Sequence, residues 1–125
     1  MSIFIDSNVI IKAFVDDKDT EKCKEVLQED FITDTVCLVE AQHSISAIKN
    51  DKSYAADCIK SLFRGSGIII HLDKNLLFES LKRIEKYDLK ISDLIHYTTA
   101  LLNNCSEIVS YDKDFDGLEI KRVEP

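Results

Sequence analysis

Carboxylate side chains stand at several places in this 125-residue chain where they could do chemistry. Asp6 directly follows a short apolar run, and Glu40 lies within a segment of helical periodicity. Asp93 opens a later apolar segment, and Asp112 and Asp114 follow a β-branched pair near the C-terminus. Clustered carboxylates repel one another, so a cluster persists chiefly where cations neutralise it. Oxygen ligands suit Mg²⁺ or Mn²⁺ and not zinc, so the pattern indicates a divalent-metal site.

Each of these residues also has an ordinary structural explanation. Asp6 could cap a helix after a strand, and Asp93 could favour the positive end of its helix dipole, which is worth ~0.3–1 kcal/mol. Glu40 could reach water from a boundary position, and the late carboxylates, Asp116 included, could form a plain acidic loop. A buried carboxylate on the helix of Glu40 would nevertheless be costly unless it is paired or bound to a cation.

The elements that must position these residues follow from the apolar periodicity. We expect strands at residues 2–5, 31–33, 68–72, 108–109 and 120–123. We expect helices at residues 9–15, 20–28, 35–49, 53–63, 73–87 and 92–103. This order predicts an α/β layered domain with a mostly parallel central sheet. Functional sites of such sheets gather at the carboxyl ends of the strands, and one edge could collect all the candidate carboxylates.

Some local features of these elements are also predicted. The apolar run at residues 68–72 is typical of a parallel strand that is buried on both faces. Val39 and Ile48 should face inward from their helix, which begins after Asp34 or Thr35. We expect Asp73 and Ser92 to cap the helices that follow them. The inward-facing residues and the caps determine how each helix is oriented, so they test the predicted helix boundaries and buried faces.

Composition limits the class of protein. One proline and three glycines indicate long regular elements, and the length fits one domain over residues 1–125. The net charge of −7 argues against a passive nucleic-acid binder, although an enzyme can still meet phosphate through metal ions. No signal peptide or membrane span is visible, so we expect a cytoplasmic protein without a membrane partner.

The cysteines give no sign of a metal or redox motif. No two of them form a CxxC pair, and we expect buried free thiols, which suit the cytoplasm. They are Cys23, Cys37, Cys58 and Cys105. His96 follows Asp93 by three residues, so a mixed metal site is conceivable, but His43 and His71 offer no matching pair.

Four blocks of the sequence, in order, resemble PIN domains. The opening IFIDSNV at residues 3–9 is similar to the first strand and acidic turn of the family. The segment VEA at 39–41 resembles its helix with a glutamate, and SDLIH at 92–96 resembles its third acidic block. The closing IVSYDKDF at 108–115 is similar to its last strand and acidic loop. The resemblance implies a PIN-like fold of three layers, with helices flanking a mostly parallel central sheet.

In size the chain is most similar to stand-alone VapC-type toxins of VapBC toxin–antitoxin pairs. That resemblance implies an Mg²⁺- or Mn²⁺-dependent endoribonuclease that cleaves RNA with metal-activated water. It also implies a homodimer and a VapB-type antitoxin. Metal-binding and catalytic roles pass to Asp6, Glu40, Asp93 and Asp112, an auxiliary metal role to Asp114, and supporting roles to Asn8 and Ser110. Products with a 5′ phosphate and a 3′ hydroxyl are expected.

RNA needs contacts beyond the metal site. Basic side chains could position phosphates, although an ordinary solvated helix face explains each of them as well. The candidates are Lys49, Lys52, Lys60, Arg64, Lys82 and Arg83.

Two other functions stay open at the level of sequence. A non-catalytic PIN scaffold could bind a protein or RNA partner without cutting it. A receiver-like phosphoacceptor domain could use Asp73 after the middle strand, but Glu40 and Asp93 have no place in it. An aspartyl phosphatase would want an aspartate where Asn8 stands.

Overall fold

A computed structural model describes residues 2–125. Strands and helices alternate along most of it, with paired helices between the first strands. The first half contains β1 (Ser2–Ile5), α1 (Ser7–Phe14), α2 (Thr20–Val26), β2 (Phe31–Asp34), α3 (Thr35–Lys49) and α4 (Lys52–Leu62). The second half contains β3 (Ile68–Ile70), α5 (Lys74–Leu81), α6 (Ile91–Leu102), β4 (Cys105–Val109), the 3₁₀ helix η1 (Lys113–Phe115) and β5 (Lys121–Val123).

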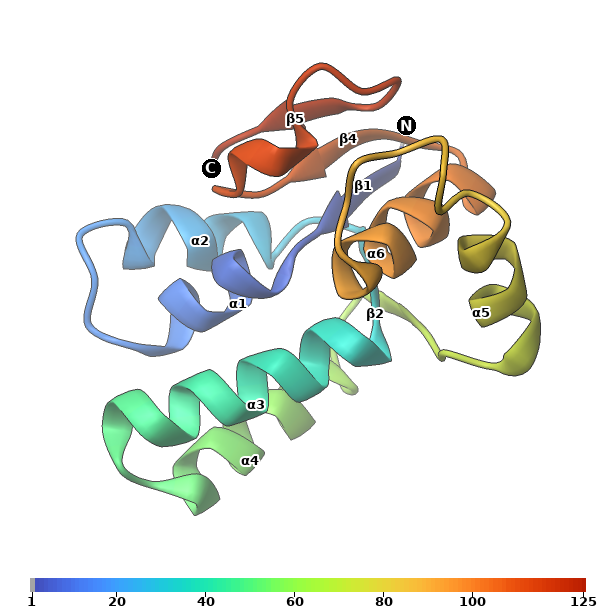
Figure 1. Cartoon of the computed structure of the whole chain (residues 1–125). Helices are drawn as coiled ribbons and strands as arrows, with labels where there is room; N and C mark the ends of the chain where they lie inside the picture. Colours follow the sequence, from blue (N-terminus) through green and yellow to red (C-terminus); the bar gives the residue numbers. More distant parts are fainter. Residues whose placement is uncertain (1) are drawn as a thin grey trace.

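The five strands form one sheet in the order β3-β2-β1-β4-β5, and every neighbouring pair is parallel. The chain moves from β1 outward to β3, then crosses back to place β4 on the other side of β1. Because crossovers between parallel strands are right-handed, this reversal puts later helices on the opposite face. Figure 1 shows α1 to α4 on one side of the sheet and α5 and α6 on the other. The predicted three-layer α/β fold is confirmed.

The core lies where the sheet meets both helix layers. Phe4 and Ile5 of β1, at the middle of the sheet, are fully buried. In the layer of α6, Tyr97 packs edge-on against Tyr87 and stacks with Phe115 of η1, at centroid distances of 4.9 and 6.4 Å. These contacts fix α6 against the segment that precedes it and against η1, so the position of its first turn is set by the core.

The inward face of α3 differs from the sequence prediction. Val39 is 70% exposed and Ile48 is also exposed. Ile45 is buried, as the sequence predicts, together with Cys37, Leu38 and Ala41, and Cys37, Ala41 and Ile45 recur at a spacing of four. Val39 stands about 200° around the helix from Cys37, so it faces away from the core. The apolar pattern of α3 occurs on both faces, and packing selected the other one.

The strand predicted at 68–72 is shorter and less buried than expected. β3 lies at the edge of the sheet and pairs with β2. An edge strand has one neighbour and lies beyond the centre of the helix layers, so Ile68 is 58% exposed. The prediction of burial on both faces is therefore wrong, although the strand is parallel.

Two helix boundaries also move. Asp73 caps α5 as predicted, with its carboxylate accepting from the backbone N–H of Leu76, but α5 ends at Leu81 instead of residue 87. α6 begins at Ile91, and its N-cap is Lys90, so Ser92 lies inside the first turn and does not cap the helix. Asp93 is thereby placed in the first turn, where the helix dipole favours an anion.

Two further observations concern the cysteines and the length of the helices. All four cysteines are buried free thiols, as expected. In residues 2–125 no helix combines the length and the apolar character that crossing a membrane requires.

Candidate metal centre

The candidate carboxylates gather where the sheet topology reverses. β1 pairs with β2 on one side and with β4 on the other. Because all three strands are parallel, their carboxyl ends lie at the same edge of the sheet. Asp6 follows β1, Asp34 ends β2 and Ser110 follows β4. Open α/β sheets form their binding crevice at such a switch point.

Asp6 is held at this edge by hydrogen bonds to both carboxylate oxygens. Oδ1 accepts from the backbone N–H of Ser7 at 2.7 Å, which caps α1. Oδ2 accepts from the hydroxyl of Ser110 at 2.6 Å and from the amide of Asn8 at 3.2 Å. Asp6 is only 3% exposed, and burial raises its pKa against the opposing effects of His96 and these hydrogen bonds. The cap explanation and a functional role are therefore compatible for Asp6.

Asn8 and Ser110 connect Asp6 to the acidic loop after β4. The side-chain Oδ1 of Asn8 accepts from the backbone N–H of Tyr111 at 3.2 Å, and Ser110 Oγ accepts from the backbone N–H of Asp112 at 2.9 Å. Asp112 in turn caps η1 by accepting from the N–H of Asp114 at 2.9 Å. This network fixes the loop that presents Asp112 and Asp114.

Asp93 is buried without a full set of partners. It is 5% exposed, and its Oδ2 is buried with no hydrogen-bond partner among the described residues. Lys90 Nζ lies 4.0 Å from this oxygen, too far for a hydrogen bond. Burial raises the pKa of Asp93 to about 6; Lys90 opposes this, and the charges of Asp6 and Asp112 add to it. A buried oxygen in this state fits a cation ligand.

Glu40 reaches the site from α3 and meets a histidine there. His96 is fully buried on α6, and its Nε2 lies 2.8 Å from Glu40 Oε1. Its Nδ1 lies 2.7 Å from Oδ2 of the buried Asp34. Burial opposes the charged imidazole, but Cys37 and the hydrogen bonds to both carboxylates outweigh it and hold the pKa of His96 well above its usual value.

Two groups of ligand atoms result, each with its members within 4.8 Å of one another. One contains Asp93, Asp112 and Asp114, and the other contains Asp6 and Glu40 with two further residues. The two groups adjoin at Ser110, whose hydroxyl donates to Asp6 Oδ2 and accepts from the backbone N–H of Asp112. The structure thus places all five proposed metal-binding carboxylates in these two adjoining groups, whereas Asp116 pairs with Arg122 outside them.

The donor set suits a hard cation. The two further residues of the second group are Cys37 and His96. Burial raises the pKa of the Cys37 thiol to about 12, so it is not a ready thiolate ligand. Both nitrogens of His96 already face carboxylates. The available donors are carboxylate oxygens, which fit Mg²⁺ or Mn²⁺ better than zinc.

Three features of this site are not predicted from the sequence. The sequence predicts Asp34 only as a helix cap, although it ends an apolar strand as Asp6 does. It offers His96 only as a metal ligand, whereas His96 bridges two carboxylates. The ion pair of Lys90 with Asp93 depends on where α6 begins, which the sequence pattern does not fix.

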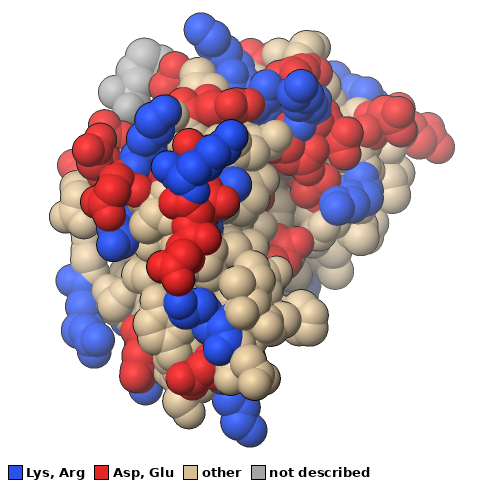
Figure 2. Space-filling view, turned by 90° about the vertical axis from the view of Figure 1, so that its left-hand side faces the viewer, with Lys and Arg blue, Asp and Glu red and all other residues tan. Residues whose placement is uncertain are grey.

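The basic candidates mostly have acidic neighbours. Figure 2 shows one face of the molecule, on which Lys and Arg side chains lie among Asp and Glu side chains. Four of the six candidates take part in ion pairs. These are Lys49 with Asp16, Lys60 with Asp57, and Lys82 and Arg83 with Glu79. Ordinary surface ion pairs account for these four positions.

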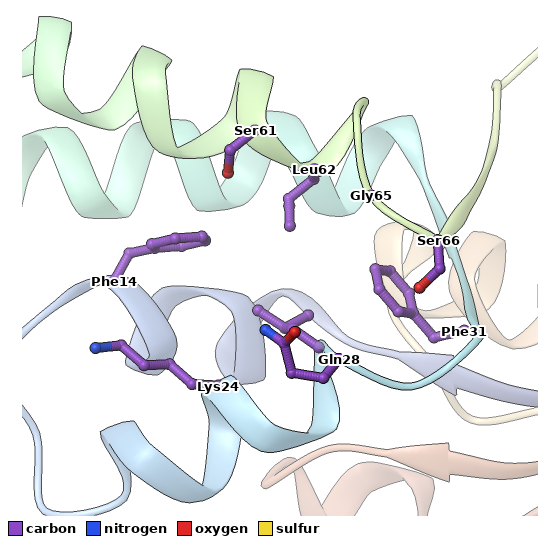
Figure 3. A pocket seen from close by; sticks show the side chains of 9 residues that line it. Phe14, Lys24, Gln28, Phe31, Ser61, Leu62, Gly65 and Ser66 are labelled. Carbon is purple, nitrogen blue, oxygen red and sulfur yellow. The ribbon is translucent and has the colours of Figure 1, made fainter.

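A separate hollow of about 350 Å³ lies between α1, α2 and α4. Figure 3 shows Phe14, Lys24, Phe31 and Leu62 among the side chains around it. None of the candidate carboxylates lines it. The chemistry of this protein is therefore to be sought at the open carboxyl edge of the sheet and not in this hollow.

Several solved structures of other proteins share the fold of this chain. VapC20 of Mycobacterium tuberculosis, described as a toxin that cleaves the Sarcin-Ricin loop, superposes with a TM-score of 0.80 at 14% identity, over 98% of this chain and 99% of that one. A toxin–antitoxin complex from Klebsiella pneumoniae gives 0.76 at 18%, over 98% and 97%. FitAcB from Neisseria gonorrhoeae gives 0.71 at 17%, over 98% and 97%.

The family of this chain follows from its sequence. No curated protein sequence matches this chain. A family model described as the PIN domain, however, matches residues 3–121, which is nearly the whole chain and includes all four acidic blocks. This protein therefore belongs to the PIN domain family.

Proposed function

We propose that this protein is a divalent-metal-dependent endoribonuclease and the toxin of a VapBC-type toxin–antitoxin pair. The observation that carries the proposal is the buried Oδ2 of Asp93, which has no hydrogen-bond partner among residues 2–125 and lies beside Asp112 and Asp114. A buried carboxylate oxygen without a hydrogen bond is costly, and a bound cation would remove the cost. Membership of the PIN family supports a nuclease.

Each residue has a part in this proposal. Asp6, Glu40, Asp93 and Asp112 would hold Mg²⁺ or Mn²⁺, with Asp114 as an auxiliary. When bound, the ion supplies a Lewis acid that activates water and offsets the charge of a phosphodiester. Asn8 and Ser110 hold Asp6 in place through their hydrogen bonds to its Oδ2. Lys90, 69% exposed at its side chain, can contact a phosphate that approaches Asp93.

RNA is the proposed substrate. The structural neighbour VapC20 is named for cleaving the Sarcin-Ricin loop, an RNA, which supports the substrate class. The net charge of −7 repels a polyanion, so RNA binding by this protein should depend steeply on divalent ions.

The test is RNA cleavage by protein purified free of any partner. Cleavage of total RNA should require Mg²⁺ or Mn²⁺, stop in EDTA, and leave 5′-phosphate and 3′-hydroxyl ends. Asp93→Asn should abolish it, while Asp57→Asn, an exposed carboxylate of α4, should cleave at the wild-type rate. Wild-type cleavage by Asp93→Asn would show that these carboxylates are not the active site.

An antitoxin and a second copy of the chain are the proposed partners, in the cytoplasm. Structures that match this fold include toxin–antitoxin complexes, which supports an antitoxin. Exposed Val39 and Phe63 line an apolar groove between α3 and α4, where a protein partner would bury them. Light scattering of the purified protein tests the dimer. Loss of cleavage at one equivalent of the polypeptide encoded beside this gene tests the antitoxin.

A further inference from the structure

We infer that His96 is a positioning residue that holds Glu40 in the candidate metal centre, and that Asp34 fixes His96 in turn. The inference rests on the proposed function, since it assigns Glu40 to the centre. It adds a role for a histidine that touches no proposed substrate. The three side chains form one chain of hydrogen bonds across β2, α3 and α6, in which Asp34 and His96 are buried and Glu40 is partly exposed.

The geometry leaves the imidazole no other arrangement. Nε2 lies 2.8 Å from Glu40 Oε1 and Nδ1 lies 2.7 Å from Asp34 Oδ2, while the ring is fully buried. A flip of the ring would place carbon atoms against both carboxylates. Glu40 is therefore held through one oxygen, and its other oxygen remains for the centre.

Asp34 couples this chain to the backbone. Its Oδ1 accepts from the N–H of Cys37 at 2.8 Å and caps α3, the helix that carries Glu40. Its Oδ2 faces His96 on α6. The Asp34 carboxylate thus holds the N-terminus of α3 against the side of α6.

Asp93 also lies on α6, one turn before His96. Within α6, Asp93 faces the acidic loop and His96 contacts Glu40 of α3, so this helix sets the position of Glu40 relative to Asp93 through His96. Without the tether, Glu40 would be a flexible side chain repelled by Asp6, whose pKa its charge raises. Partners of metal ligands of this kind typically change metal affinity 10- to 100-fold.

The experiment measures Mn²⁺ affinity by isothermal titration calorimetry on the full chain, without RNA. His96→Asn keeps a group near Nδ1 but loses the contact with Glu40, and we expect Mn²⁺ to bind about 10- to 100-fold more weakly. His96→Gln can donate to Glu40 from the Nε2 position and should stay within about threefold of wild type. Thr98→Val, which removes a buried hydroxyl without a partner on the same helix, should not change the affinity.

A double-mutant cycle separates positioning from general support of the fold. If His96 acts through Glu40, then His96→Asn should add no further loss in a Glu40→Gln background. Additive losses, or equal weakening by His96→Gln and His96→Asn, would overturn the inference.

A second measurement needs no metal and stays decisive if a His96 variant does not fold. Long-range ¹H–¹⁵N spectra of the metal-free protein should show the His96 ring resonances displaced in Glu40→Gln and unchanged in Asp57→Asn. Unmoved resonances in Glu40→Gln would refute the contact. A wild type that shows this coupling but cleaves no RNA would reject the proposed function alone, and cleavage without coupling would reject this inference alone.

Discussion

Asp93→Asn should make the metal-free protein more stable while it removes the proposed activity. The carboxylate is 5% exposed, and one of its oxygens has no hydrogen-bond partner among the described residues. Folding without metal therefore buries a charge that Lys90, with its Nζ 4.0 Å from Oδ2, compensates only in part. A neutral amide of the same shape removes that charge, although it also removes the cation ligand.

The magnitude follows from the raised pKa of Asp93. The folded value of about 6 against the ordinary 3.8, at ~1.36 kcal/mol per pH unit, corresponds to a cost of about 3 kcal/mol at pH 8. Because the folded state binds the proton more tightly, the free energy of unfolding falls as pH rises from about 4 to about 6, then levels off. An amide is also poorly solvated there, so we expect a gain of about 1–3 kcal/mol at pH 8, and roughly half of it at pH 5.

The assay is urea denaturation in EDTA at pH 8 and pH 5. Asp114→Asn is the matched control, because it removes an exposed carboxylate of the same cluster and should change stability little. Adding Mg²⁺ should stabilise the wild type and leave Asp93→Asn unchanged. A variant less stable than wild type at pH 8, or a gain equal at both pH values, would refute the reasoning.

Three further outcomes are expected. Asp6→Asn should be less stable than Asp93→Asn by about 1–3 kcal/mol, measured by the same denaturation, because its amide would face donors that now bond both carboxylate oxygens. Gly67→Ala should lower the free energy of unfolding by about 1–3 kcal/mol, since a Cβ there would lie 2.3 Å from the Phe31 ring, whereas Gly65→Ala meets nothing closer than 3.7 Å and should be nearly neutral. Calorimetry should show Mn²⁺ affinity falling about tenfold per pH unit below pH 6, because protonation of Asp93 then competes with the metal; a flat profile would contradict this.

Local sequence was sufficient for the order of elements and for much of the site. β-branched runs and their flanking carboxylates predicted the strands at 2–5 and 31–33 and the cap at Asp34, because strand ends and caps depend on neighbouring residues. Asp6 and Asp112 could be proposed for the same reason, since each follows a strand whose carboxyl end a parallel sheet brings to one edge.

The buried face of α3 and the position of β3 in the sheet could not be predicted from local sequence. α3 carries apolar residues on two faces, so its buried face depends on the surfaces of α1 and α4 against which it packs. The apolar run of β3 has the composition of a central strand, but its place at the edge follows from the route of the whole chain. Both are decided by contacts between distant segments.

The sequence by itself determined the family, the layered α/β fold and the acidic residues of the candidate centre. Only the tertiary structure decided their partners. His96 lies 62 residues from Asp34 and 56 from Glu40, and no local pattern links positions so far apart. Burial then gives those contacts their chemical effect, because the environment that unites His96 with two carboxylates also leaves an oxygen of Asp93 without a hydrogen-bond partner in the described part of the chain.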